Sequence, residues 1–278
     1  MPQTIYESTH KTVAERSLNP QEQNRAWWEA LPMTYAEWDS AERLPKTAAD
    51  FEAINQAYLH SNPWIAENVR FKSFHDKWVL EIGCGAGSAT CLFAKAGAHV
   101  TAIDLTAQAV AMTGANAAAQ DLANVRVVRM DAEKLDLPDR SLDHVYSWGV
   151  IHHSNAPQVI FNHVGRVLRP GGGGLVMVYN RSSLRYWIKG LQWLVFKGKL
   201  FSGETMASVQ RFFTDGFFHK HYSPRELARS LEQAGLSDVR LSCTHMNKKM
   251  IPLIPRFLDE WLKRHYGWLL IAEFKKTS

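Results

Sequence analysis

The sequence predicts an α/β protein built on a doubly wound, mostly parallel sheet. Three observations point to this fold class. From residue 76 onward, short apolar segments alternate with helical ones; a glycine-rich turn follows the first apolar segment; and acidic residues end the next two. Parallel strands joined by right-handed crossovers place their carboxyl ends at one edge, where open sheets of this kind bind ligands.

The alternation can be followed element by element. The strands expected from short apolar runs lie at 77–83, 98–104, 125–131, 142–150, 174–180, 236–244 and 267–276. The helices expected between them lie at 88–97, 107–121, 157–172 and 223–235. The third of these helices is expected to stop at Pro170 and the glycines after it. In the last helix, Ser223 and Glu226 have the spacing of a capping box. Residues 245–266 predict a partly helical insertion broken by prolines.

Two segments fall outside this alternation. Residues 1–75 predict short helices broken by prolines, which we interpret as an N-terminal helical cap on a main domain at 76–278. Residues 180–222 interrupt the main domain as a helical lid insertion, with an amphipathic stripe over 184–195. This insertion carries seven basic and two acidic residues, a net charge of +5 that equals the net charge of the whole chain.

Bulk composition narrows the class of protein further. The chain has 278 residues, a mild basic excess and three cysteines without a CxxC pair. This cysteine usage argues against a disulfide framework or a zinc site and fits a reducing compartment. The N-terminus shows no signal peptide, and no apolar stretch reaches the length of a membrane span. We therefore expect a cytoplasmic protein without a metal, either a monomer or a homodimer.

The stretch VLEIGCGAGSAT at residues 79–90 is the strongest ligand signal. Glycine lets the backbone approach a ligand, and the helix that follows offers free N–H groups. A dinucleotide turn would need Gly or Ala at position 88, which is Ser88. Instead Glu81 precedes the turn and would suit a cationic part of a ligand. Asp104 ends the second strand and could accept hydrogen bonds from ribose hydroxyls, and Asp131 ends the third.

These motifs together give the chain a clear resemblance. With VLEIGCGAG, VTAID, MDAEKLDLPDRSLDHVYSWGVIHH and VLRPGGGGLVMVY, it resembles class I S-adenosylmethionine-dependent methyltransferases of the type 11-like group, over about residues 76–181 and 223–275. The resemblance implies a seven-stranded Rossmann-like sheet whose last strand is antiparallel, and S-adenosyl-L-methionine as cofactor. The cofactor-binding residues that it implies are Glu81, Gly83, Cys84, Gly85, Gly87, Asp104, Leu105, Asp131, Ala132, Ser147 and Trp148.

The chemistry of methyl transfer leaves the catalytic residues open. The cofactor supplies the reactivity, so that alignment and exclusion of water can suffice without a general base. Histidine nevertheless suits a base near neutral pH. The candidates are His152 and His153 after the fourth strand, and His219, His221 and Tyr222 at the end of the insertion. The aromatic residues expected to close the cofactor site from the other side are Trp27, Trp28, Tyr35 and Trp38.

The sequence favours methyl transfer to an oxygen or nitrogen of a small, partly hydrophobic metabolite. An RNA methyltransferase is disfavoured because dense basic runs and an NPPY-like tetrad are missing, and a non-catalytic partner is disfavoured because the cofactor residues are intact. The aromatic and basic residues of the insertion fit a cover over a hydrophobic acceptor, a contact with an anionic membrane surface near a lipid substrate, or an extension of the core or a dimer contact.

Overall fold

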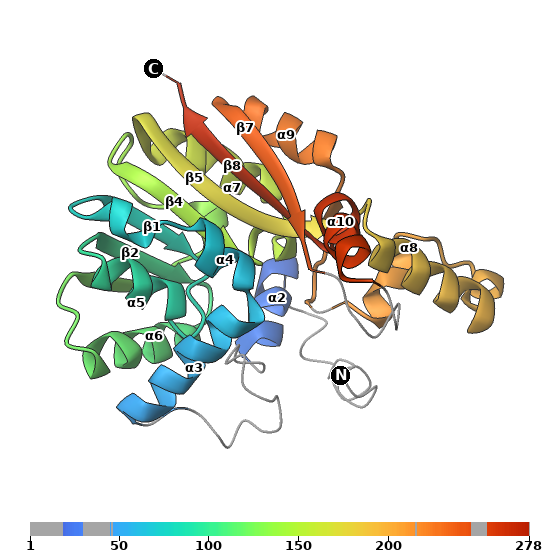
Figure 1. Cartoon of the computed structure of the whole chain (residues 1–278), viewed down its shortest axis with the longest axis horizontal. Coiled ribbons are helices and arrows are strands. Elements are labelled where there is room, and N and C mark those ends of the chain that lie inside the picture. Colours follow the sequence, from blue (N-terminus) through green and yellow to red (C-terminus); the bar gives the residue numbers. More distant parts are fainter. Residues whose placement is uncertain (1–18, 30–44, 46, 215, 246–254, 278) are drawn as a thin grey trace.

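In the computed structural model, one twisted sheet forms the centre of the molecule, and helices cover both of its faces (Figure 1). The structure describes residues 19–29, 45, 47–214, 216–245 and 255–277. Among these, the strand order is β3-β2-β1-β4-β5-β8-β7, with the short β6 beside β5. The strand bounds are β1 Trp78–Ile82, β2 His99–Asp104, β3 Val125–Arg129, β4 Leu142–Trp148, β5 Leu168–Asn180, β6 His221–Tyr222, β7 Leu236–Thr244 and β8 Leu269–Lys276. The β8 strand runs antiparallel to both β5 and β7, which confirms the predicted sheet.

Strand residues alternate between two apolar layers. Leu80 and Val145 face one layer, whereas their chain neighbours Val79 and Tyr146 face the other. The first layer is completed by α7 (Pro157–Val167) and α9 (Pro224–Gln233). The second is completed by α5 (Ser88–Lys95), with α6 (Ala107–Ala119) packed beside it. Burial on both faces explains why β1 and β2 each have four consecutive buried residues rather than an alternating pattern.

Four helical elements precede the sheet. One of them, α2 (Pro20–Glu29), lies beside α6. The other three, α3 (Ala48–Ser61), α4 (Pro63–Asn68) and the 3-10 turn Phe71–Phe74, pack onto the second layer. A capping box between Thr47 and Asp50 begins α3. The Tyr58 hydroxyl lies 2.7 Å from the Tyr146 hydroxyl, and Ile65 is fully buried in the same core. These helices therefore share a core with the sheet.

Two element boundaries differ from the sequence prediction. The helix predicted over 157–172 ends at Val167, and β5 begins at once at Leu168. Pro170 disfavours helical geometry at Arg169, and the glycines that follow pair with β4 through a bulge, so this segment extends the strand. The helix predicted over 184–195 is α8 (Leu184–Leu191), which continues as a π-helical turn at Gln192–Phe196. The capping box at the start of α9 is confirmed.

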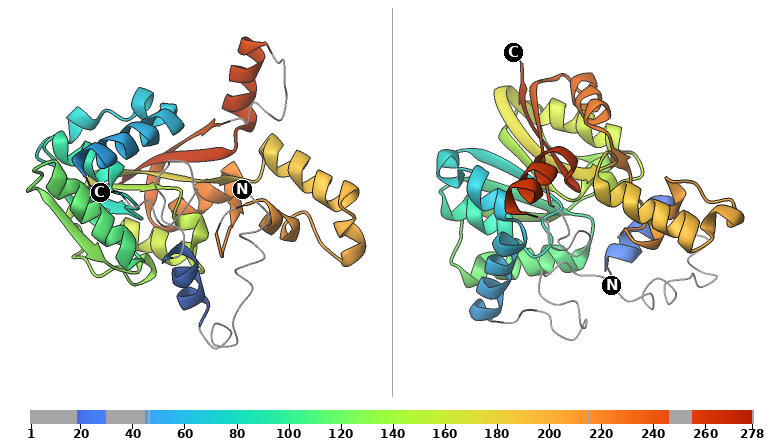
Figure 2. Two further views of the ribbon diagram at one scale, coloured as in Figure 1. Left: turned by 90° about the horizontal axis from the view of Figure 1, so that it is seen from below. Right: turned by 45° about the vertical axis from the view of Figure 1, so that its right-hand side comes forward.

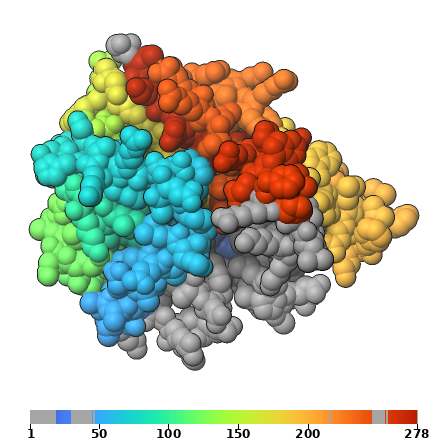
Figure 3. Space-filling model, in the orientation of Figure 1, coloured from blue at the N-terminus to red at the C-terminus, as the bar shows by residue number. Residues whose placement is uncertain are grey.

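Two helical projections leave the body of the molecule (Figure 2). The arm, residues 184–212, consists of α8, the π-helical turn and the 3-10 turns Lys199–Ser202 and Ser208–Phe212. The second projection is α10 (Arg256–Tyr266), which leads into β8. The space-filling view shows the arm extending beyond the main body at one side (Figure 3). The part of the predicted insertion at 246–254 lies outside the described residues.

Candidate functional site

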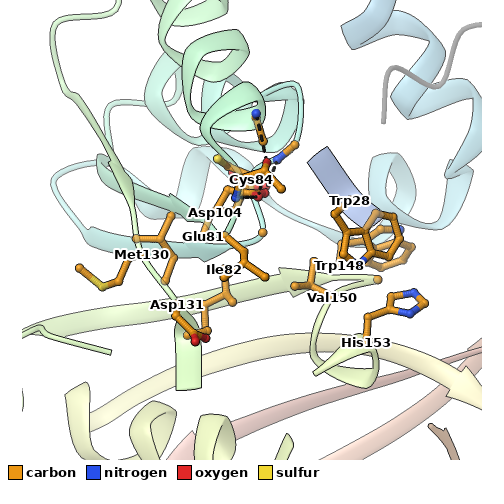
Figure 4. Close-up of a pocket in the computed structure, with 18 of the residues that line it drawn as sticks. Trp28, Glu81, Ile82, Cys84, Asp104, Met130, Asp131, Trp148, Val150 and His153 are labelled. Atoms are coloured by element: carbon orange, nitrogen blue, oxygen red, sulfur yellow. Dashed lines mark hydrogen bonds between the residues drawn. The ribbon is translucent and has the colours of Figure 1, made fainter. Parts of the chain in front are cut away.

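A cavity opens at the carboxyl edge of β1, β2 and β4, where the sequence placed the ligand. It encloses about 1180 Å³ of space, part of it open to solvent. Figure 4 shows Asp131 and Met130 at one end, Glu81, Cys84 and Asp104 in the middle, and Trp28, Trp148 and His153 at the other end. The predicted cofactor residues that line it are Glu81, Gly83, Cys84, Gly85, Asp104, Leu105, Asp131, Ala132 and Trp148. The cavity is therefore assembled from three strand ends and from α2.

The glycine turn after β1 needs its glycines for two different reasons. Gly83 has φ +79°, and a Cβ there would lie 2.2 Å from Cγ2 of Val150, so a side chain would be both strained and obstructed. Gly85 also has a positive φ, of 54°, and lines the cavity. Gly87 is placed differently from the prediction. It does not line the cavity but starts α5 in a left-handed conformation, packed against Thr113.

Polar side chains behind the turn hold its carbonyls, and sequence reasoning missed them. The Thr113 hydroxyl donates to the carbonyl of Gly85 at 3.1 Å, and Asn116 Nδ2 donates to the carbonyl of Ala86 at 2.7 Å. Asn55 of α3 bonds to Asn116 in turn. Because two carbonyls of the turn are engaged on the α6 side, the turn is held in one conformation. Thr and Asn facing a glycine turn from the next helix carry no sequence signature of their own.

The acids after β2 and β3 are both oriented by hydrogen bonds. Asp104 accepts from the Gly85 amide at 3.2 Å and from the Thr106 amide and hydroxyl at 3.0 and 2.9 Å. Burial raises the pKa of Asp104 above its ordinary value, and these hydrogen bonds oppose the rise. Asp131 accepts from Gln21 Nε2 of α2 at 3.0 Å and from the Glu133 amide at 2.9 Å. Asp104 thus fixes the turn while facing the cavity.

Glu81 lies under the turn and is 5% exposed. The Thr90 hydroxyl of α5 donates to its carboxylate. Burial raises the pKa of Glu81 from its ordinary 4.5 to about 8; the bond from Thr90 opposes the rise and the nearby Asp104 adds to it. The carboxyl is therefore mostly protonated at pH 7. A cationic group bound beside it would favour the ionised form, so the site fits an ammonium group better than an anion.

Aromatic rings line the far end of the cavity. Trp148, at the end of β4, donates through its indole N–H to Asn62 Oδ1 at 3.0 Å and stacks on Trp64. Trp28 of α2 lies edge-on to His153, with ring centroids 4.9 Å apart. Ser147, which was predicted to contact the cofactor, lies outside the cavity lining. Its buried hydroxyl donates to the backbone carbonyl of Ile82 at 3.2 Å, so its observed contact ties β4 to β1.

Among the five predicted catalytic residues, His153 is the one that lines the cavity. Its Nδ1 lies 2.6 Å from the carbonyl oxygen of Phe218. A carbonyl can only accept, so Nδ1 carries the proton and Nε2 is left as an acceptor. Burial lowers the pKa of His153 to about 4, so the ring is neutral at pH 7.

The other four predicted catalytic residues lie behind the cavity wall and outside its lining. His152 is fully buried, with its ring centroid 4.0 Å from that of Tyr179. His221 and Tyr222 form β6 against the end of β5. The His221 ring lies in an aromatic cluster with Tyr179, Tyr186 and Trp268, and burial lowers its pKa to about 3. The Tyr222 ring packs in the first apolar layer, near Phe161. His219 leads into the same strand, where its pKa is also lowered by burial.

The α2 helix forms one wall of the cavity, and the sequence predicted only some of the residues in this wall. Trp28 was expected to close the site and does line it; Gln21 and Asn24 line it as well and were missed. Glu29 accepts hydrogen bonds from the amides of Ala107 and Gln108, so α2 is tied to the start of α6. Residues 35 and 38, also expected at this wall, lie outside the described part of the chain.

The residues present fit S-adenosylmethionine. The glycine turn leaves a cradle that a Cβ at Gly83 would close, Glu81 suits an ammonium group, and Asp104 can accept from hydroxyls. Across the described ranges, no group of three side chains has the arrangement of a metal site. None of the helices in those ranges is long and apolar enough to cross a membrane.

Comparisons with known proteins agree with this geometry. A family model described as a methyltransferase domain matches residues 80–176. A ubiquinone biosynthesis O-methyltransferase of Acinetobacter baumannii is 25% identical over 248 residues, covering 88% of this chain and 92% of that protein. A sterol 24-C-methyltransferase of Gibberella zeae is 30% identical over 123 residues, which are 44% of this chain and 32% of that protein.

A solved structure supports the fold. The S-adenosylmethionine-dependent methyltransferase from Mesorhizobium loti superimposes with a TM-score of 0.54 at 21% identity, covering 77% of this chain and 96% of that one. Its likeness concerns the fold; the family model, which spans the glycine turn, Asp104 and Asp131, concerns the site. The sheet, the cavity at its carboxyl edge and these similarities together identify the chain as a class I S-adenosylmethionine-dependent methyltransferase, an enzyme that takes its methyl group from that cofactor.

Proposed function

We propose that the enzyme methylates an oxygen atom on a ring-bearing, partly hydrophobic small molecule. The observation that carries this proposal is the polarity of the cavity. Its acids and the glycine turn lie from one end to the middle, and the rings of Trp28, Trp148 and His153 lie at the other end. Aromatic side chains make favourable contacts with a flat acceptor while excluding water. Exclusion of water favours a displacement at a charged methyl donor over hydrolysis.

Within this proposal the polar end holds the cofactor. Glu81 would face the ammonium group of its methionine part, Asp104 would accept hydrogen bonds from the ribose hydroxyls, and Asp131 would lie beside the adenine. Leu105 and Ala132 line the same end. The cofactor supplies the methyl group; the chain binds it, orients it and shields it from water.

His153 would act on the acceptor. Its Nδ1 is held by Phe218, which fixes the ring and leaves Nε2 as the acceptor nitrogen. A neutral imidazole in this state can accept a hydrogen bond from an acceptor hydroxyl and so orient the oxygen for attack. A depressed pKa makes His153 a weak base. Its main role in this proposal is therefore to orient the acceptor hydroxyl, and acceptance of the hydroxyl proton is secondary.

The choice of oxygen over nitrogen rests on the relatives. The similarity to the ubiquinone O-methyltransferase extends over 88% of this chain. The similarity to the sterol C-methyltransferase is confined to 44% of the chain, so it bears chiefly on the part that the family shares.

We also propose that residues 1–75 act as a cap and 180–222 as an insertion beside the acceptor end.

A panel of acceptors tests the proposal. Catechols with alkyl tails of increasing length are compared with anilines on the same framework, and with RNA, by mass spectrometry of the products. We expect S-adenosylmethionine-dependent O-methylation whose kcat/KM rises with tail length. Trp28→Ser should raise KM for the catechols, whereas Trp78→Ser, a matched change at an exposed tryptophan of β1 outside the cavity, should not. Methylation of the anilines or of RNA alone would refute the proposal.

A further inference from the structure

The arm carries apolar side chains that are exposed to solvent. We call this set the arm apolar surface; its members are Trp187, Ile188, Leu191, Val195, Phe196, Leu200 and Phe201, all of them exposed. Phe196 is 85% exposed and Phe201 91% exposed, and both lie at the end of the arm beside the turn at Gly198. Figures 2 and 3 show the arm as a projection rather than a flat face.

The opposite side of the arm is well packed, so its exposed residues are not the result of a loosely built segment. Tyr186 and Leu194 are buried on that side. A Cβ on Gly190 would lie 2.2 Å from Sδ of Met206, which shows how closely the returning chain approaches α8. Gln210 Nε2 donates to the carbonyl of Tyr186 at 3.2 Å. The arm is thus an ordered element with one satisfied side and one open apolar side.

The charge of the arm decides between its possible partners. Residues 184–203 contain Arg185, Lys189, Lys197 and Lys199 and no acidic residue. Arg185 is turned inward, over the ring of Trp268, whereas Lys197 is exposed next to Phe196. A two-fold dimer through this surface would place the same cationic segment against itself, which costs electrostatic energy. A surface of anionic lipid headgroups complements both the lysines and the rings.

We propose that the arm docks onto an anionic membrane surface, with the Phe196 and Phe201 rings inserted among the lipids and Lys197 and Lys199 at the headgroups. Aromatic rings at a protruding tip gain from leaving water, and lysines beside them bind phosphate. Docking of this kind is interfacial and needs no spanning helix.

The arm is also connected directly to the cavity wall. The chain returns from the arm past Gly216, where a Cβ would lie 2.2 Å from Nδ1 of His153. The Lys220 amide then donates to the carbonyl of His152 at 2.8 Å. The chain therefore links the arm directly to the acceptor end of the cavity. If the arm binds a membrane, this end of the cavity is held near the lipids, where it could take up an acceptor dissolved in them.

Sedimentation of the full chain with vesicles tests the docking. We expect binding to phosphatidylcholine vesicles that contain phosphatidylglycerol, and much weaker binding to pure phosphatidylcholine. The Phe196→Ser/Phe201→Ser variant should bind the anionic vesicles at least about tenfold more weakly. The Lys197→Gln/Lys199→Gln variant should lose roughly fivefold for each lysine on anionic vesicles and nothing on neutral ones.

Matched controls separate the arm from other exposed rings. Phe257→Ser removes a ring that is 77% exposed on α10, and it should leave vesicle binding unchanged. An equal loss from Phe257→Ser, or full binding by the Phe196→Ser/Phe201→Ser variant, would overturn the proposal. So would sedimentation velocity showing that this double variant dissociates a dimer without altering vesicle binding. The vesicle assay needs neither acceptor nor cofactor, so its outcome is independent of the proposed O-methylation.

Discussion

Replacing Glu81 by glutamine should stabilise the free enzyme and weaken its binding of S-adenosylmethionine. Glutamine has nearly the same shape and keeps an oxygen for the Thr90 hydroxyl, so the variant removes the ionisable group with little change in packing. The structure predicts opposite effects on stability and binding because burial disfavours the ionised carboxyl that a bound ammonium would need.

The magnitude follows from the pKa. Glu81 titrates near 4.5 when exposed and near 8 when folded, so the unfolded chain releases its proton first as the pH rises. Its contribution is therefore most favourable below pH 4.5 and is lost as the pH rises towards 8. Each pH unit in that window costs about 1.4 kcal/mol, which amounts to roughly 3 kcal/mol at pH 7. Glu81→Gln has no carboxyl group at this position, so its free energy of unfolding is not lowered in this way.

Urea unfolding of both proteins at pH 5.5 and pH 8 measures the effect. Other titrating groups act alike in the two proteins, so the difference between them isolates Glu81. That difference should grow by about 3 kcal/mol from pH 5.5 to pH 8 in favour of Glu81→Gln. Calorimetry at pH 8 should show S-adenosylmethionine binding weakened by roughly ten- to a hundredfold, the loss expected for a charge-assisted hydrogen bond.

Two results would refute this reasoning. A stability difference that does not change with pH would mean that Glu81 is not buried as a neutral acid. Unchanged cofactor affinity in Glu81→Gln would mean that the carboxylate does not face a cationic group of the cofactor.

Three further predictions concern Asp104, Gly83 of the turn and the partly buried His144. Asp104→Asn should weaken cofactor binding by about 1–3 kcal/mol in calorimetry, with Asp121→Asn, an exposed acid, as an unaffected control. Gly83→Ala should lower the free energy of unfolding by more than about 1 kcal/mol, whereas Gly114→Ala, with open space on α6, should raise it by roughly 0.5–1 kcal/mol; equal effects would contradict the strain argument. Burial lowers the pKa of His144 to about 4, so the free energy of unfolding should fall as the pH drops from 6.5 to 4. In His144→Phe, urea unfolding should show a fall that is about 3 kcal/mol smaller than in the parent protein.

Most of the sheet and the polar end of the cavity could be predicted from the sequence. Local signals suffice there: an apolar run sets a strand, a glycine turn ends it, and acids at strand ends meet at one edge. Glu81, Asp104 and Asp131 were predicted in this way, and all three line the cavity.

One strand boundary and the positions of two motif residues differ from what the sequence suggested, for physical reasons. The strand β5 begins at Leu168 because pairing with β4 overrides the turn preference of the proline and glycines, and pairing is a non-local interaction. The cofactor contacts of Gly87 and Ser147 stay predictions, but neither residue lines the cavity. Orientation separates them from their neighbours: Gly87 starts α5, and the Ser147 hydroxyl bonds inside the sheet to Ile82.

The histidines show the same limit. His152 and His153 are adjacent in sequence, yet one ring is enclosed by Tyr179 and the other lines the cavity. The contact that fixes His153 comes from Phe218, 65 positions away, and no spacing rule anticipates it. The supports behind the turn, Thr113 and Asn116, are equally invisible to a local analysis.

The position of β8 has a consequence for how the chain folds. This strand follows all the others in sequence, yet it lies between β5 and β7 and is hydrogen-bonded to both. Until residues 269–276 are in place, β5 and β7 are two unpaired edges that do not touch each other. Pairing over about a hundred residues is slow to form, and open edges invite aggregation. Insertion of β8 should therefore be the late step that closes the sheet, and any fragment lacking it should expose both edges at once.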